Sequence, residues 1–114
     1  MRVTTIAALA GAAVLLAACA ASPKPTADSL DAVARDYVAL TLEIGEREPG
    51  YVDAYYGPAE WAQAAKVNPR ALPQLAEGAA ALTRRLEALP EWGLDDQSRQ
   101  RRAYLLAHVS AASA

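Results

Sequence analysis

The sequence predicts an all-α protein, a bundle-like arrangement of three to four short helices. Apolar residues recur at helical spacing in several segments, Pro or Gly separates these segments, and no run alternates apolar and polar residues as a strand would. The last helical pattern is still running at Ala114, and large apolar side chains are few. We therefore expect the front part of a larger helical domain, with a genuine small bundle as the alternative.

The first helix is expected to begin at Thr26 or Asp28, since either side chain can cap a helix. It should end near Arg47 or Glu48, because a residue before Pro49 is driven out of the α region. Its broad apolar stripe at helical spacing consists of Leu30, Val33, Ala34, Tyr37, Val38, Leu40, Thr41, Leu42 and Ile44.

A later helix carries a heptad-like apolar seam. Asn68-Pro69 or Pro73 should open this helix, because Pro is favourable in a first turn, and Pro90 should close it. Gly78 inside it either marks a close helix crossing or is incidental. The seam advances in alternating steps of three and four residues through Leu72, Leu75, Ala79, Leu82, Leu86 and Leu89.

The last helix is expected to start at Asp95 and Asp96, where negative charge is favourable. Its predicted apolar side consists of Tyr104, Leu105, His108, Val109 and Ala112. Spacing of four residues predicts ion pairs on the solvent-facing sides of the helices, at Asp31–Arg35, Glu43–Arg47 and Asp95–Arg99.

Between the first helix and the seam lies the stretch YVDAYYGPAEW, which holds four of the seven aromatic residues. We expect YVDAYY to form one and a half helical turns, Gly57 to end them in a left-handed conformation, and Pro58 to begin the next helix. Packing in a corner between Ala-rich helices is the favoured interpretation, and a cleft for a sugar or peptide is the alternative. The binding cluster of that alternative consists of Tyr51, Asp53, Tyr55, Tyr56, Glu60 and Trp61.

The N-terminus has the pattern of an export signal, with Met1-Arg2 followed by the apolar run Val3 to Ala18. This run spans only about 24 Å as a helix, less than a hydrocarbon core of about 30 Å. It ends in LAAC, which resembles the bacterial lipoprotein signal. The resemblance implies cleavage after residue 18 and attachment of fatty acids such as palmitate to Cys19, the only cysteine.

We therefore expect residues 1–18 to be a lipoprotein signal peptide, 19–26 a lipidated Cys and an extended Pro-containing tether, and 27–114 the helical domain. The expected partner is the lipid bilayer, bound through acylated Cys19. Two or three acyl chains bind a bilayer more firmly than a single chain does. Ala20 follows the Cys, with no Asp, and the sorting pattern of Gram-negative lipoproteins then implies the outer membrane. The domain should face the periplasm.

The charge and residue content of the mature 96 residues exclude several functions. Ten Lys and Arg stand against thirteen Asp and Glu, a balance that argues against a nucleic-acid partner. His108 is the only histidine, so a paired-histidine metal site is not expected, and no cofactor or catalytic residue is predicted. The seryl residues lack a plausible base.

Three segments carry a resemblance to a known family: 36–61, 84–89 and 99–107, most specifically at YVDAYYGP. They look like the opening of a bacterial family of unknown function. Its longer members are helical and carry an H-E-x-x-H motif of zinc-peptidase type further along. The metal-binding region of that family has no counterpart in these residues.

Two hypotheses about function follow. The chain is predicted to be a membrane-anchored lipoprotein with a non-catalytic helical module of unknown role. The alternative is the N-terminal fragment of an envelope zinc-peptidase-like hydrolase whose active site lies beyond Ala114.

Overall fold

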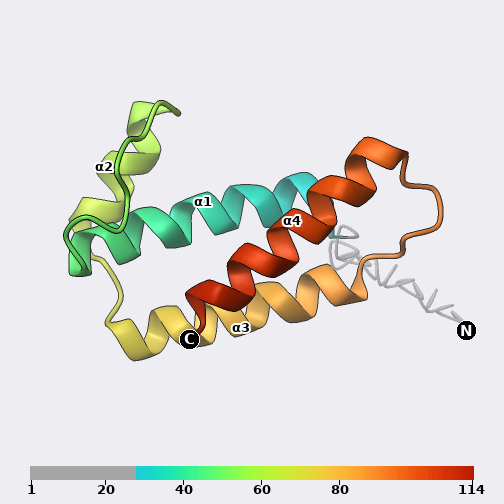
Figure 1. Ribbon diagram of the computed structural model, residues 1–114. Coiled ribbons are helices and arrows are strands. Elements are labelled where there is room, and N and C mark those ends of the chain that lie inside the picture. Colours follow the sequence, from blue (N-terminus) through green and yellow to red (C-terminus); the bar gives the residue numbers. More distant parts are fainter. Residues whose placement is uncertain (1–27) are drawn as a thin grey trace, which may run out of the picture.

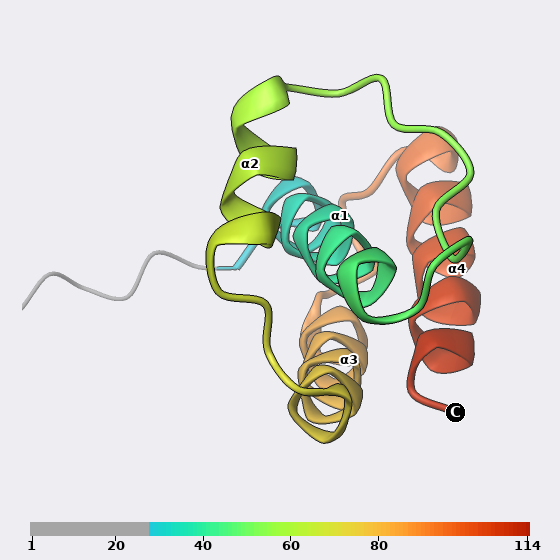
Figure 2. The same ribbon diagram turned by 90° about the vertical axis from the view of Figure 1, so that its left-hand side faces the viewer.

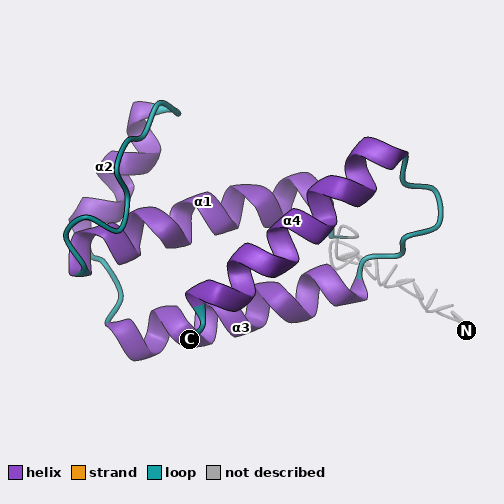
Figure 3. Ribbon diagram, in the orientation of Figure 1, coloured by secondary structure: helices purple, strands orange, loops and turns teal. Residues whose placement is uncertain are grey.

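The computed structural model describes residues 28–114, which form four helices and no strand. The helices are α1 (Leu30–Arg47), α2 (Ala59–Val67), α3 (Leu72–Ala88) and α4 (Asp96–Ala112). The predicted all-α class is confirmed (Figures 1 and 3). The signal peptide, the lipidated Cys19, the tether and the suggested cap Thr26 lie outside the described residues.

Helix α1 is the centre of the bundle. It contacts each of the other three helices, and α3 also packs against α4. Seen nearly along α1, the other helices are placed around it on different sides (Figure 2). Helix α3 runs antiparallel to α1 (Figure 1). The short α2 packs against α1 at the end opposite the α3–α4 loop. Because α1 must bury apolar surface in three directions, it needs the wide stripe that its sequence carries.

The N-cap of α1 is Ser29, and neither suggested cap occupies that position. The Ser29 hydroxyl accepts a 3.0 Å hydrogen bond from the Ala32 amide. Asp28 instead accepts the Ser29 amide at 3.0 Å and uses its carboxylate for an ion pair with Arg85. The helix ends at Arg47, as Pro49 predicts.

The other helix boundaries follow the predicted signals. Helix α3 begins at Leu72 with Pro73 in its first turn and ends two residues before Pro90. Asp95 caps α4, since its carboxylate accepts a 2.7 Å hydrogen bond from the Ser98 amide. Hydrogen bonding from the Ser98 side chain first, and then from its backbone amide, lowers the pKa of the Asp95 carboxyl.

The core is entirely apolar within the described residues, where no buried polar side chain occurs. Four of the six seam positions of α3 are buried, whereas Leu72 is 43% exposed and Leu89 is half-buried. The core cluster consists of Val33, Leu40 and Ile44 from α1, Leu75, Ala79, Leu82 and Leu86 from α3, and Leu105 and Val109 from α4.

The apolar side of α4 is narrower than predicted. Leu105 and Val109 are buried, but Tyr104 is 59% exposed and His108 is exposed. Each of these two rings precedes a core residue by one position, a rotation of about 100° around the helix. The centroids of the two rings lie 4.0 Å apart. The rings therefore pack against each other rather than against the core.

Gly78 marks a close helix crossing, the first of the two predicted alternatives. A Cβ atom at this position would lie 3.2 Å from Cδ1 of Leu40 on α1 and 3.0 Å from Nη1 of Arg70. The absent side chain therefore lets α3 approach α1 closely.

Five of the six ion pairs among residues 28–114 connect different helices or a helix and a loop, and none has the predicted spacing of four residues. Asp31 pairs with Arg101 of α4 at 2.5 Å, and Glu43 pairs with Arg70 at 2.6 Å. On α4 the pair is Asp96–Arg99, three residues apart, because Asp95 is engaged as the cap. Long arginine side chains reach across the grooves between helices, where neighbouring carboxylates are available.

Replacing Leu86 by Ala should destabilise the bundle by about 2–5 kcal/mol, because this fully buried side chain would leave a cavity between α3 and its neighbours. The matched control is Leu72→Ala on the same helix, which should cost about 1 kcal/mol or less because Leu72 is partly exposed. Urea unfolding of the mature chain followed by circular dichroism measures both. Equal losses for the two variants would contradict this description of the core.

Candidate functional site

The stretch YVDAYY is an irregular loop and contains no helical turn, contrary to the prediction. Gly57 does not adopt a left-handed conformation, since only Gly50 and Gly93 have positive φ among the described residues. The requirement at Gly57 is space: a Cβ there would lie 2.5 Å from the Tyr55 hydroxyl oxygen. That hydroxyl donates a 2.9 Å hydrogen bond to the Pro58 carbonyl and closes the loop over the glycine.

The structure divides the predicted binding cluster among separate places. Tyr51 is 46% exposed and lines a groove of about 330 Å³ together with the ends of α1, α3 and α4. On α1, burial first and then the charges of Tyr51 and Tyr104 raise the pKa of Tyr37. The groove that Tyr51 lines therefore contains no other member of the predicted cluster.

The remaining members lie along the loop and α2. Desolvation and then the Glu60 carboxylate raise the pKa of Tyr55. Tyr56 is 96% exposed, Asp53 is exposed, and Trp61 is half-buried. Because Tyr51 and Tyr56 are so exposed, the favoured interpretation of a packed aromatic corner is wrong for these two side chains.

A groove lies between α1 and α2. Its cavity volume is about 520 Å³, within the range of small-molecule sites. One wall is the indole of Trp61, and the Arg35 guanidinium lies 5.3 Å from the centre of that ring. The groove is lined by Ala32, Arg35, Asp36, Ala39, Glu43, Trp61, Ala64 and Ala65.

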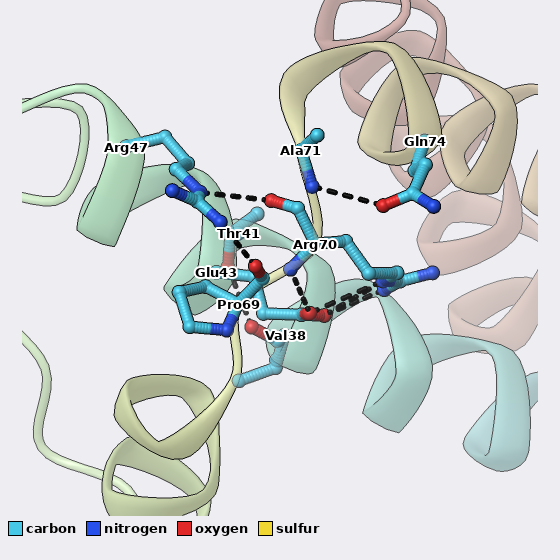
Figure 4. A network of polar contacts seen from close by, with 8 residues as sticks. All are labelled: Val38, Thr41, Glu43, Arg47, Pro69, Arg70, Ala71 and Gln74. Atoms are coloured by element: carbon cyan, nitrogen blue, oxygen red, sulfur yellow. Dashed lines mark hydrogen bonds and ion pairs between the residues drawn. The ribbon is translucent and has the colours of Figure 1, made fainter.

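The two carboxylates of this groove are held by arginines from outside it. Nε and Nη2 of Arg70 donate to the Glu43 carboxylate, with the shortest contact at 2.6 Å, and the Arg70 backbone amide adds a further bond at 3.2 Å (Figure 4). Asp36 pairs with Arg85 of α3 at 2.6 Å. Hydrogen bonds from the Arg70 side chain lower the pKa of Glu43 more than its partial burial raises it.

Arg47 fixes the segment between α2 and α3 in the same network. Its guanidinium donates to the carbonyl oxygens of Pro69 and Arg70, the latter at 3.0 Å (Figure 4). The loop that delivers Arg70 to Glu43 is thus bound by two side chains of α1. These hydrogen bonds therefore fix the protein around the Glu43 end of the groove.

Arg35 is the cation that the groove presents. Among residues 28–114 it forms no ion pair, and its contact is with the face of Trp61. Such a site could receive an anionic group at the guanidinium, with alanine methyl groups beneath and an indole beside it. The i, i+4 spacing predicts a pair between Asp31 and Arg35, but Asp31 binds Arg101 of α4 instead.

Residues 28–114 contain no group of three or more His, Cys, Asp or Glu side chains placed to hold a metal ion. None of the four helices is both long and apolar enough to cross a membrane.

Comparison of the chain with protein-family models, with curated proteins and with solved structures finds no match.

The stability of the mature chain should depend on Glu43 in a pH-dependent way. The pKa of Glu43 is lower in the folded chain than its unfolded value of about 4.3, so its contribution is present above that pH and is lost as the pH falls through the folded-state pKa. In Glu43→Gln, the loss of unfolding free energy should be largest at neutral pH and shrink in acid. Urea unfolding at a series of pH values measures it.

Glu46→Gln on the same helix is the control, because Glu46 is exposed and forms no ion pair among the described residues. The unfolding free energy of this variant should fall in acid in the same way as that of the wild type. If the wild-type and Glu43→Gln curves ran parallel down to acid pH, the Glu43–Arg70 contact would contribute no pH-dependent stability.

The contact between Arg35 and Trp61 should show as a coupling in stability. A double-mutant cycle with Arg35→Ala and Trp61→Ala is expected to give a coupling of about 0.5–1 kcal/mol, typical of a cation–π contact near the surface. The parallel cycle with Arg84→Ala and Trp61→Ala should give none. Equal coupling in both cycles would show that α2 does not hold the indole over Arg35.

Proposed function

We propose that the chain is an outer-membrane lipoprotein, anchored through acylated Cys19, whose helical domain is a non-catalytic module on the periplasmic side. The observation that carries the proposal is the LAAC sequence at the end of a short apolar run, with the only cysteine of the chain at its last position. Cysteine at that position suits acylation, and no second cysteine is available for a disulfide.

The arrangement of the described domain is compatible with a tethered module. Ser29 caps α1 ten residues after Cys19, so the folded part begins a short distance along the chain from the proposed anchor. Two or three acyl chains would hold the domain at the bilayer, whereas a single chain gives only marginal binding. No helix of the described part needs to enter the membrane for this anchoring.

The groove between α1 and α2 is the surface that we assign to ligand or partner contact. It combines the volume of a small-molecule site, an indole wall and an arginine without an ionic partner among the described residues. These features fit recognition of an anionic group. They supply binding, and the groove-lining residues include no nucleophile paired with a base.

Acylation is tested by mass spectrometry of the protein purified from the membranes of a Gram-negative host. The expected product starts at Cys19 and carries the added mass of fatty acids, and Cys19→Ser should lose both this mass and the membrane fraction. Ala20→Asp is the matched variant for sorting, expected to keep its lipid but to remain in the inner membrane. A bare thiol or an uncleaved leader in the natural product would contradict the proposal.

A further inference from the structure

Trp92 is held outward at the tip of the loop between α3 and α4. Its side chain is 83% exposed, although indole is among the largest apolar groups a chain can bury. The loop makes a tight turn, in which the Leu94 amide donates to the Glu91 carbonyl at 3.2 Å and Gly93 has a φ of 87°. Glycine at the third position of such a turn leaves Trp92 at its corner.

This loop lies at the end of the bundle where the described chain begins (Figure 1). Arg85, near the end of α3, binds both carboxylate oxygens of Asp28, at 2.7 and 2.9 Å. Arg102 of α4 binds the Leu86 carbonyl at 3.0 Å and the Glu91 carboxylate at 2.8 Å. Asp28 and the Trp92 loop are therefore both held near the end of α3, Asp28 by Arg85 and the loop through Arg102.

The length of chain before the domain limits its distance from the anchor. Eight residues separate Cys19 from Asp28. A polypeptide of that length spans at most about 30 Å when fully extended. With the proposed anchor, Asp28, at the same end of the bundle as the Trp92 loop, therefore lies within about 30 Å of Cys19, whereas α2 lies at the opposite end (Figure 1).

We propose that Trp92 inserts its indole into the headgroup region of the bilayer and sets the domain upright on the membrane. The inference rests on the proposed anchoring through Cys19. Indole suits this layer because it has an apolar body and one polar N–H, and tryptophan is enriched at membrane–water interfaces for that reason. The proposed partner of the exposed loop is thus lipid.

The charges around Trp92 are already paired within the protein. Glu91 binds Arg102, Asp96 binds Arg99 at 2.7 Å, and Asp95 caps α4. The loop carries no cluster of free basic residues that would attract anionic lipid. Contact therefore depends on the indole and should withstand salt.

The test uses the full acylated protein, purified in detergent and reconstituted into phosphatidylethanolamine–phosphatidylglycerol vesicles whose acyl chains carry bromine near the headgroup. Trp61→Phe leaves Trp92 as the only indole, and Trp92→Phe leaves Trp61. Bromine should quench the emission of Trp92 and shift its maximum to the blue, but should leave Trp61 emission unchanged. Raising the salt concentration should not reverse the quenching. If Trp61→Phe fails to fold, the wild-type signal minus that of Trp92→Phe gives the same quantity.

The outcomes separate this inference from the proposed function. Acylated protein that floats with the vesicles while Trp92 stays unquenched would overturn the inference and leave the anchor in place. Quenching of both indoles alike, or quenching removed by salt, would also overturn it. Protein that lacks acyl chains and does not float would contradict the anchor, and the inference would fall with it.

Discussion

The close contact between α1 and α3 is the constraint on which the rest of the bundle depends. A Cβ atom on Gly78 of α3 would lie 3.2 Å from Cδ1 of Leu40 on α1, so a side chain there would push Leu40 aside. Ala79 beside it is fully buried, so α3 presents two of the smallest residues where Leu40 presents a large one. Alternation of large and small residues across a crossing is how a thin core reaches dense packing.

Once α3 lies close to α1, the arginines can bridge from one helix to another. Arg85 reaches Asp28 and Asp36 from α3, Arg101 reaches Asp31 from α4, and Arg70 reaches Glu43 from the loop before α3. Their side chains are partly exposed, so each pair contributes little on its own. Together they select one arrangement of short, Ala-rich helices whose apolar faces would tolerate several.

The sequence predicted the features that depend on local chemistry. Pro49, Pro90 and Asp95 act on their own backbone neighbours, and the helix boundaries near them are where the pattern placed them. The seam of α3 was recognised because one face of a helix is a periodic signal. The ion pairs were not predicted, since their partners lie twenty-seven residues apart for Glu43–Arg70 and seventy for Asp31–Arg101. The aromatic loop was misjudged because YVDAYY has no periodicity to distinguish a helical turn from a loop closed by Tyr55.

The same geometry gives the bundle two chemically different ends. At one end, Asp28 is bound by Arg85 of α3, and Glu91 in the loop of Trp92 is bound by Arg102 of α4. At the other end, the aromatic loop and α2 lean on α1 (Figure 1). Because α1 runs between these ends and contacts every other helix, an orientation imposed on its first turn is imposed on the whole domain. A bilayer contact at Trp92 would therefore direct α2 and the Glu43 end of the groove away from the lipid.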